Sequence, residues 1–357
     1  MTTTLPLRVG LVGCGVISDT YLRRSAGFDG FDIVACADAD AARANERASD
    51  HGITAGPFDE LLTDPAIDCI LDLTPPTAHF DVALAALRAG KHVYQEKPLA
   101  IELHEAQTLL READAAGVRL GCAPDTFLGA GLQTVRAVLD EGRLGEPVGC
   151  AVAMVNGGPE HWHPAPEFFY AHGGGPLFDV GPYLVTTAVA LLGPVRSVTA
   201  FTRRLRDERV VGSGPRQGQH FPVEVDTTVM ALLEHGDGPI TSLATSFDIP
   251  GRACPFELHG TLASVEGPDP NAFGGPVRIR EGQETVEVPL LPGADDEARG
   301  IGLDDMAHAL VEGRPERASG ALAAHVLEVL HAVLESARSG RHVEIASTVE
   351  RPEPLPV

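Results

Sequence analysis

Short apolar runs alternate with amphipathic stretches along the first third of the chain. Helical patterns at 78–89 and 101–116 end at Gly90 and Gly117, and glycine is common at helix C-termini. The apolar runs predict buried strands because they are short and bounded by turn residues. They lie at 7–12, 31–38, 67–73, 92–95 and 118–123. This alternation predicts right-handed βαβ units, and so a doubly wound parallel sheet of the Rossmann type.

The pattern changes after Pro124. Helical patterns span 127–141 and 321–337, and a strand-like run covers 148–155. Further β-rich runs predict a large, mostly antiparallel sheet; they lie at 195–202, 223–233, 239–247, 255–265 and 276–288. We therefore expect an α/β protein with an N-terminal domain over 1–123 and an α+β domain over 124–357. One face of the large sheet is expected to pack against another subunit, in a homodimer or homotetramer.

Composition is that of a soluble globular protein. The 357 residues are 44% hydrophobic and 22% charged, and no apolar run approaches the roughly 18 residues that cross a bilayer. The N-terminus lacks the basic region and cleavage pattern of a signal peptide. Six scattered cysteines without a CxxC pair are typical of reduced, buried thiols. These features predict a cytoplasmic protein.

Acidic side chains dominate the charge. The 50 acidic and 27 basic residues give a formal net charge of −23. Such a surface repels phosphate backbones and anionic lipid, so we expect neither a nucleic acid nor a membrane as a partner. An anionic ligand must then be held locally, by backbone N–H groups or by one or two cations.

A glycine turn, GCGVIS, follows the first strand and leads into a helical pattern. Gly13 permits the tight turn, and Gly15 lets a pyrophosphate approach the helix start at Val16 and Ile17, where unpaired N–H groups favour anions. Asp38, at the end of the next strand, can accept hydrogen bonds from a ribose 2′-hydroxyl and repel a 2′-phosphate. The first domain is therefore predicted to bind NAD in preference to NADP. The alternative is a structural turn, with Asp38 merely starting a helix.

A lysine lies where the fourth strand of this domain ends. Ligands of such sheets bind beyond the carboxyl ends of the strands, so Lys97 is expected to face the nucleotide. The alternative is a lysine in an exposed turn. The other residues at this edge that are expected to position the cofactor are Thr74, Pro75, His79, Glu96 and Asp125.

An acid, a phenol and hydroxyls line up in GGGPLFDVGPYLVTTAVALLG. If its helix begins near Phe178, Pro182 falls close to the first turn, where a missing N–H costs little. Asp179, Tyr183 and Thr187 then share one face, at i, i+4 and i+8. Such a face could bind a polyol. The alternative is a polar edge near the helix start, which we favour for the threonines.

The irregular stretch before that helix contains the sequence EHWHP. His161 or His163 could act as an acid/base because histidine titrates near neutrality. Trp162, the single tryptophan, could cover a nicotinamide or a substrate, or simply anchor the loop. Glu160 and His172 lie nearby, but the ligand spacing is irregular, so we expect histidines that contact substrate and no metal.

These motifs resemble the Gfo/Idh/MocA family, which includes glucose–fructose oxidoreductase and inositol dehydrogenase. The likeness is carried by GCGVIS, ACADAD, TPPTAH, EKP, and GGG followed by DxG, and it extends over nearly the whole chain. The resemblance implies a two-domain, dimeric or tetrameric, NAD(P)-dependent oxidoreductase of sugars or cyclitols. It also implies that Lys97 is catalytic, that the Lys97–Pro98 peptide is cis, and that Asp179 lies on the substrate helix.

The substrate helix departs from the family pattern D-x-G-x-H-x-x-D, in which the histidine is the acid/base. Tyr183 replaces that histidine, and Thr186 replaces the second aspartate. Lys97 could stabilise a developing alkoxide and take its proton if the site lowers its pKa. Tyr183 could transfer the proton or only hydrogen-bond a hydroxyl, and a histidine of the EHWHP stretch, such as His163, is the alternative base.

The sequence therefore predicts an NAD-dependent enzyme that oxidises a secondary hydroxyl, or reduces a ketone, of a sugar, sugar derivative or cyclitol. One alternative is a redox-neutral epimerase with tightly held NAD. Another is a dinucleotide-binding sensor without catalysis, which would need neither Lys97 nor Asp179. The residues expected to contact the substrate are Lys97, His161, Trp162, His163, Asp179 and Tyr183.

Overall fold

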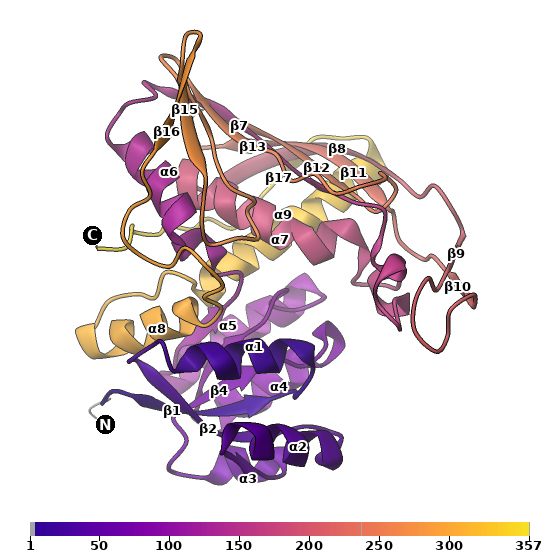
Figure 1. Cartoon of the computed structure of the whole chain (residues 1–357), viewed down its shortest axis with the longest axis vertical. Coiled ribbons are helices and arrows are strands. Elements are labelled where there is room, and N and C mark those ends of the chain that lie inside the picture. The colour runs from indigo at the N-terminus through magenta and orange to yellow at the C-terminus, as the bar shows by residue number, and fades with distance from the viewer. Residues whose placement is uncertain (1–3, 237, 357) are drawn as a thin grey trace. The chain divides into compact units, whose positions relative to one another are not determined.

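The computed structural model describes residues 4–236 and 238–356. The chain forms two compact units, each made of two segments (Figure 1). The first unit comprises Met1–Leu128 and Glu297–Leu327, and the second comprises Gly129–Asp296 and Glu328–Val357. The predicted boundary at residue 123 therefore misses a late segment that belongs to the first unit.

A six-stranded, wholly parallel sheet forms the centre of the first unit. Its strand order, β3-β2-β1-β4-β5-β6, confirms the predicted doubly wound arrangement, in which ligands bind where the order reverses beside β1. The strands are β1 (Leu7–Val12), β2 (Phe31–Ala37), β3 (Thr54–Ala55), β4 (Cys69–Asp72), β5 (His92–Gln95) and β6 (Leu120–Cys122). The helices between them are α1 (Val16–Ser25), α2 (Ala41–His51), α3 (Phe58–Thr63), α4 (Pro76–Arg88) and α5 (Leu103–Ala116).

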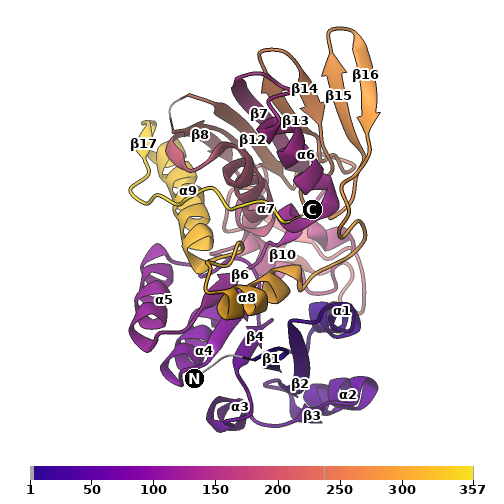
Figure 2. The same ribbon diagram turned by 90° about the vertical axis from the view of Figure 1, so that its left-hand side faces the viewer.

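Helices cover the faces of this sheet, which explains why its strands read as continuous apolar runs. β4 is buried along its whole length, and in β1 only Arg8 is exposed. Figure 2 shows α4 and α5 beside each other at one flank of the sheet, and α2 beside β2 and β3 at the other.

The returning segment completes the first unit with α8 (Ile301–Glu312). The N–H group of Cys122, at the end of β6, donates to the carbonyl of Ala318 at 3.0 Å. The N–H groups of Gly300 and Gly302, at the start of α8, donate to the side chain of Asp125. These two glycines lie 175 and 177 residues after Asp125 in the chain. Local periodicity does not predict contacts of this sequence separation, which is why the boundary at residue 123 was incomplete.

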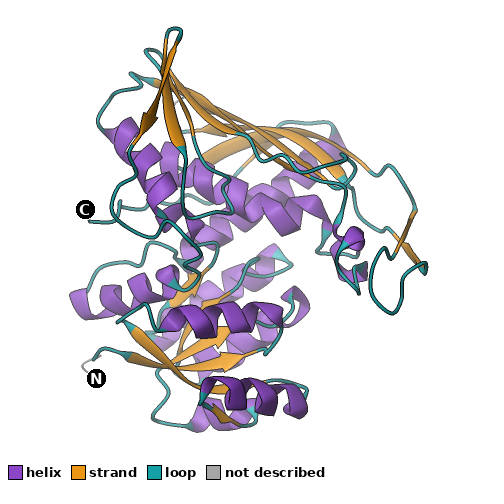
Figure 3. Ribbon diagram, in the orientation of Figure 1, coloured by secondary structure: helices purple, strands orange, loops and turns teal. Residues whose placement is uncertain are grey.

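A nine-stranded sheet forms the second unit, with α6, α7 and the C-terminal part of α9 on one of its faces (Figure 3). Its order is β16-β15-β14-β13-β7-β12-β11-β8-β17, and only the β7–β12 pair is parallel, so the mostly antiparallel prediction is confirmed. The strands are β7 (Pro147–Val155), β8 (Val195–Arg203), β11 (Thr228–His235), β12 (Ile240–Ser246), β13 (Phe256–Gly260), β14 (Ser264–Glu266), β15 (Val277–Glu281), β16 (Glu284–Val288) and β17 (Val343–Glu344). The helices are α6 (Ala130–Asp140), α7 (Gly175–Leu192) and the part of α9 (Gly320–Ser339) from Glu328 onward. The strands β9 (Glu208–Val210) and β10 (His220–Pro222) form a separate hairpin.

Helix α7 begins earlier than the sequence predicted. It starts at Gly175 and not near Phe178, because Gly175 adopts φ +84° and Pro176 occupies the first turn. Pro182 therefore lies inside the helix and cannot donate a hydrogen bond to the Phe178 carbonyl. The predicted first-turn position of Pro182 is wrong; Pro176 is the first-turn proline.

Two helices are long and apolar enough to cross a membrane by length and composition, α7 and α9. In the fold, 89% of the relevant window of α7 and 61% of that of α9 are buried. Burial inside the protein is typical of the core helices of a packed domain, and we interpret both helices in this way.

Candidate active site

The glycine turn after β1 has the geometry that a dinucleotide requires. Gly13 has φ +96°, and a Cβ there would lie 2.6 Å from the carbonyl carbon of Leu73, so only glycine fits. A Cβ added to Gly15 would meet no described atom within 4 Å, so the approach to the start of α1 is open. Gly15 is the N-cap residue of α1, and no side chain caps the helix there. The N–H groups of Val16 and Ile17 in the first turn can therefore bind a pyrophosphate.

Asp38 lies directly beside this turn. Its carboxylate accepts hydrogen bonds from the N–H groups of Cys14 at 2.7 Å and Asp40 at 2.8 Å. Arg43 Nη1 lies 3.6 Å from the same carboxylate. An acid fixed at the end of β2 fits the predicted role in binding the ribose. The turn and the acid together fit a bound NAD.

The backbone around Lys97 is held by the sheet and by one buried phenol. The Glu96 N–H donates to the Asp72 carbonyl at 2.9 Å, which continues the β4–β5 pairing. One Glu96 carboxylate oxygen accepts from the Tyr21 hydroxyl at 3.0 Å, and the other accepts from the Lys97 N–H at 3.2 Å. In the structure Glu96 links α1 to the lysine turn, and its expected part in positioning the cofactor stays a prediction. Sequence reasoning missed Tyr21, which lies in the α1 helical pattern among core residues.

The side chain of Lys97 lies half-buried near the carboxyl end of β6. Its positive charge opposes the rise in pKa that burial causes at the Cys122 thiol. The Lys97–Pro98 peptide is cis, as the resemblance implied. The lysine therefore belongs to the same sheet edge as the glycine turn, where ligands of parallel sheets bind.

His79 joins the loop after β4 to the lysine turn. The side chain is 1% exposed, and its Nδ1 and Nε2 lie 2.7 Å and 2.8 Å from the carbonyl oxygens of Pro98 and Thr74. Carbonyl oxygens only accept hydrogen bonds, so both bonds form together only when both ring nitrogens carry protons. Burial raises the pKa of the neighbouring Asp72 carboxyl, and His79 opposes the rise. His79 thus fixes the loop in which Thr74 and Pro75 lie; contacts of these residues with the cofactor stay predictions.

Asp125 caps the start of α8. One oxygen of its carboxylate accepts hydrogen bonds from the N–H groups of Gly300 and Gly302, each at 3.1 Å. The residue is 1% exposed, and burial raises its pKa to about 6. The structure gives this predicted cofactor residue a structural role in the first unit, and a contact with the cofactor stays a prediction.

In the second unit, α7 carries the predicted polyol-binding residues at helical spacing. Asp179 is half-buried, Tyr183 is 7% exposed, and Thr187 is 1% exposed, so burial increases along the line of side chains. The Thr187 hydroxyl has no hydrogen-bond partner among the described residues. Asp179 and Tyr183 therefore lie at the more accessible end of the line.

The EHWHP loop exposes an aromatic cluster. Trp162 and Phe168 are 66% and 50% exposed, and the ring of His163 packs edge-on against both and against Phe169. The N–H of Ala165 donates to His163 Nδ1 at 3.1 Å, so Nε2 carries the proton when the ring is neutral. His163 can therefore donate from Nε2 to a ligand hydroxyl.

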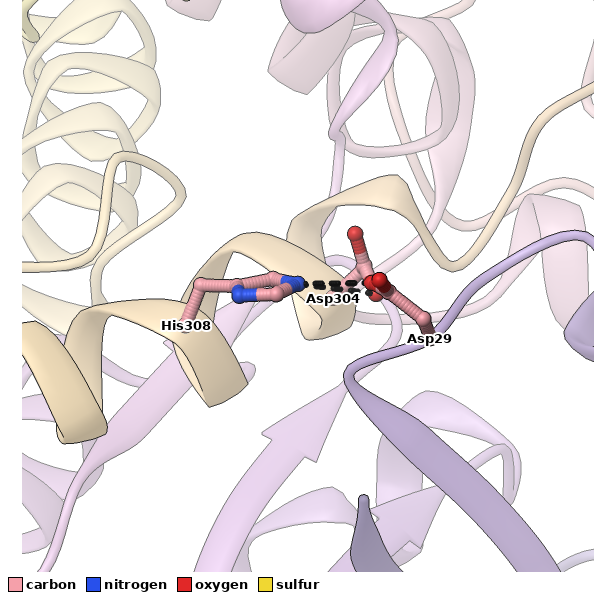
Figure 4. Close-up of side chains that lie close together, drawn as sticks. All are labelled: Asp29, Asp304 and His308. Carbon is pink, nitrogen blue, oxygen red and sulfur yellow. Dashed lines mark hydrogen bonds and ion pairs between the residues drawn. The ribbon is translucent and has the colours of Figure 1, made fainter. Parts of the chain in front are cut away.

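A possible metal-binding group lies elsewhere, in the first unit. Figure 4 shows Asp29, Asp304 and His308, whose ligand atoms lie within 4.8 Å of one another. His308 Nε2 already hydrogen-bonds Asp29 at 2.9 Å, and Asp304 accepts from the Gly30 N–H at 2.8 Å. Asp29 is exposed and the other two are partly buried, and we interpret the group as a link between α8 and the residues before β2. The predicted absence of a metal near the EHWHP loop stays a prediction.

Comparison with known proteins places the chain in a family. Residues 7–123 match the oxidoreductase family with an NAD-binding Rossmann fold, and residues 132–266 match the GFO/IDH/MocA C-terminal domain. The uncharacterized oxidoreductase YdgJ of Escherichia coli is 32% identical over 267 residues, which cover 72% of this chain and 70% of that protein. The chain belongs to the Gfo/Idh/MocA family, and it is an oxidoreductase with an NAD-binding domain.

Two further proteins are similar over nearly the full length. The 1,5-anhydro-D-fructose reductase of Ensifer adhaerens is 28% identical over 349 residues, which cover 95% of this chain and 98% of that protein. The structure of levoglucosan dehydrogenase in complex with NADH and L-sorbose superposes with a TM-score of 0.82 at 23% identity. That match covers 95% of this chain and 98% of the dehydrogenase, and it shows the shared fold.

Proposed function

We propose that this oxidoreductase oxidises a secondary hydroxyl of a sugar, sugar derivative or cyclitol, or reduces the corresponding ketone, with NAD as the hydride carrier. The observation that carries the proposal is the sheet edge of the first unit. There, an open glycine turn, a fixed Asp38 and a half-buried Lys97 share one edge of the parallel sheet, which supports a cofactor site beside a catalytic lysine. The names of two similar proteins, a sugar reductase and a sugar dehydrogenase, support the substrate class.

Each residue at this edge has a distinct part in the proposed reaction. Gly15 admits the pyrophosphate, and Asp38 accepts hydrogen bonds from the ribose hydroxyls. When bound, NAD supplies the acceptor for the hydride. Lys97, as the neutral amine, accepts the hydroxyl proton, and the ammonium that forms stabilises the negative charge on the reacting oxygen. The hydrogen bonds to Glu96 and the buried His79 keep the lysine turn in place.

The second unit is proposed to bind the remaining substrate hydroxyls. Asp179 accepts hydrogen bonds from hydroxyl groups, and Tyr183 donates or accepts one. The proton leaves through Tyr183 or through a histidine of the EHWHP loop, since the family's helix histidine is replaced here. Asp179→Asn tests this part of the proposal: a raised KM for the substrate with an unchanged Kd for NAD supports substrate binding by Asp179, and an unchanged kcat/KM contradicts it.

The test of the activity is NADH formation with a panel of cyclitols and sugars. The purified protein is given free NAD and each compound in turn, and absorbance of NADH is followed. A compound that drives repeated turnover supports the dehydrogenase. Stoichiometric NAD released on denaturation, with no NADH in bulk and with an altered sugar stereocentre, would indicate the epimerase instead. NAD binding with neither outcome across the panel would favour the sensor and contradict an enzymatic role.

We also propose that a second copy of the chain covers the outer face of the large sheet. Phe201, Met230 and Leu232 are 78%, 47% and 53% exposed on adjacent strands β8 and β11, where Met230 pairs with Phe201. They line a hollow of about 430 Å³ on the sheet. An exposed apolar surface of this kind is typical of an interaction site.

Sedimentation measurements test this assembly. Phe201→Glu is expected to convert the dimer or tetramer to a smaller species, because the carboxylate would be buried without a partner. Leu262→Glu is the matched control, since Leu262 is 72% exposed in the turn between β13 and β14. A monomeric wild-type protein, or an unchanged mass for Phe201→Glu, would contradict the proposal.

A further inference from the structure

A buried arginine joins the EHWHP loop to the large sheet. Arg209 lies on β9, and its side chain is 3% exposed. One terminal nitrogen, Nη1, donates to the carboxylate of Glu160 and to the Gly157 carbonyl at 3.2 Å. The other, Nη2, donates to the carboxylate of Asp248 and to the Phe247 carbonyl at 2.9 Å. The guanidinium thus holds two segments about 90 residues apart in the chain.

Both carboxylates of this arrangement are themselves fixed. The side chains of Glu160 and Asp248 are 6% and 7% exposed. The Tyr170 hydroxyl donates to the second oxygen of Glu160, and the Arg209 guanidinium lies 5.0 Å from the centre of the Tyr170 ring. The second oxygen of Asp248 accepts from the hydroxyls of Thr227 at 2.6 Å and Thr228 at 2.9 Å. Every carboxylate oxygen of the pair therefore has a donor.

A small apolar core surrounds the charges. It consists of Tyr170, Val211, Phe221, Val223 and Phe247, with Phe169 packed against it. A buried ion pair adds little stability compared with apolar side chains of the same volume, whereas its directional bonds allow one arrangement only. The arginine is therefore better suited to fix a geometry than to raise stability.

Arg209 fixes the position of the exposed aromatic cluster on the EHWHP loop. Glu160 directly precedes His161, Trp162 and His163, and its carbonyl accepts from the Gly212 N–H at 2.8 Å. The N–H groups of Trp162 and His163 donate to the Pro159 carbonyl, at 3.1 Å and 2.8 Å, so the turn is continuous from Glu160 to His163. The anchored acid thereby sets the direction of the tryptophan and histidine side chains.

We propose that Arg209 is a positioning residue for substrate binding: it holds the Glu160–His163 turn as a preformed wall, on which the Trp162 ring stacks against the face of a saccharide or cyclitol ring. This inference rests on the proposed function for the identity of the substrate. Sugar rings present C–H groups on their faces and hydroxyls at their edges, and the cluster offers an aromatic face with a histidine N–H beside it. A wall that is ordered before binding lowers the entropy cost of recognition.

The main test compares three variants of the full-length protein. Arg209→Lys keeps the charge but cannot hold both carboxylates at once. Arg209→Met leaves two buried carboxylates without their cation, and its folding is expected to suffer. The triple variant Arg209→Met, Glu160→Gln, Asp248→Asn removes all three charges and is expected to recover the Tm. The control is Arg196→Met, which removes an exposed arginine paired with Glu234 at 3.4 Å.

The single tryptophan gives a readout that needs no turnover. In the Lys variant and in the triple variant, Trp162 fluorescence should show lower anisotropy than in the wild type. For a substrate from the panel, KM should rise roughly tenfold while kcat changes less, because ring binding is weakened before the chemical step. The control should match the wild type in both measurements.

Two results would overturn the inference. The first is a triple variant that recovers its Tm and has the same Trp162 anisotropy and the same KM as the wild type. Arg209 would then contribute to folding alone. The other is disturbed anisotropy with an unchanged KM, since the loop would then be held by Arg209 without contributing to substrate binding. If no sugar or cyclitol is turned over by the wild type, the proposed function fails. Quenching of Trp162 by sugars, measured without turnover, would still separate that failure from failure of this inference.

Discussion

The lysine turn of the first unit and the EHWHP loop of the second are held in place by different forces. The turn around Lys97 is held mainly by backbone groups: the Glu96 N–H continues the strand pairing, and two carbonyls fix His79. The EHWHP loop is held by the buried guanidinium of Arg209 and by two carboxylates. The first arrangement follows from the parallel sheet itself, whereas the second depends on particular side chains from distant segments.

This difference bears on which region can vary. Side chains exposed on the loop can change without disturbing the sheet, provided that the charged anchor is kept. The lysine turn has less freedom, because its position is set by the end of β5 and by the loop after β4. The predictions below test the two regions separately, beginning with the largest expected effect.

The first prediction concerns the chemical role of the lysine turn. Lys97→Met should lower kcat by about 10³-fold, because the variant loses the cation beside the reacting oxygen and the proton-transfer group. The Kd for NAD should stay within a few-fold of the wild type, since the glycine turn and Asp38 are intact. Steady-state kinetics and a binding titration measure the two quantities. An unchanged kcat would show that the lysine has no part in the reaction.

A second prediction concerns the pH dependence of the first unit. Burial raises the pKa of Asp125 to about 6, from 3.8. A carboxyl whose pKa is raised in the folded state favours folding below its unfolded pKa, and this contribution is lost as the pH rises through the folded value. Between about pH 4 and pH 7, ionisation of Asp125 should therefore cost up to about 3 kcal/mol of unfolding free energy.

Asp125→Asn isolates that contribution. Both hydrogen bonds from the start of α8 end on one oxygen of Asp125, so the amide oxygen of asparagine can accept them without a charge. The stability of the variant relative to the wild type should increase as the pH rises over this window, measured by denaturant unfolding. A constant difference between the two proteins across the window would contradict a buried, pH-sensitive carboxyl.

A third prediction separates the two candidate proton-transfer groups of the second unit. If Tyr183 transfers the proton, Tyr183→Phe should lower kcat by about 10²-fold, while His163→Gln should mainly raise KM. If the histidine is the base, the pattern reverses, so that His163→Gln lowers kcat and Tyr183→Phe mainly raises KM. If both substitutions change kcat only slightly, Lys97 would be the single proton-transfer group among these candidates.

The smallest expected effect concerns cofactor choice. Asp38→Ala should reduce the preference for NAD over NADP by about tenfold, since the carboxylate that repels a 2′-phosphate is gone while Arg43 stays close by. The ratio of kcat/KM for the two cofactors measures it. Asp38→Ala combined with Arg43→Ala is the control, which should bind NADP less well than the single variant. Persistence of the original preference would place the ribose elsewhere.

Much of the fold could be predicted from periodicity. The five predicted strands of the parallel sheet and the helices α1, α4 and α5 agree with the sequence to within a few residues, because each strand is a short apolar run bounded by turns. The short strand β3 and the helices α2 and α3 were not predicted. The run at 255–265 proved to be two strands, β13 and β14, joined by a tight turn, and the run at 276–288 is the hairpin of β15 and β16. The β9–β10 hairpin was missed because each of its strands has only three residues, and α8 was missed because its partners lie far away in sequence.

The parts of the candidate site that could be predicted are those whose sequence motif implies a particular backbone geometry. Gly13, Gly15 and Asp38 could be placed from their spacing after one strand. Tyr21 and Arg209 could not, because a tyrosine in a helical pattern and an arginine in a short strand carry no signal of the carboxylates that they meet. The start of α7 was misplaced because three consecutive glycines were assigned to the loop before it.

Transfer of a deuteride tests the central claim most directly. The protein is incubated with NAD and a sugar or cyclitol deuterated at the carbon of each secondary hydroxyl in turn, and the products are examined by mass spectrometry and NMR. Our account predicts that deuterium from one such carbon appears at the nicotinamide C4 of NADH. Retention of every deuterium on its original carbon, with the configuration of that carbon unchanged, for all substrates that bind, would contradict hydride transfer by this protein.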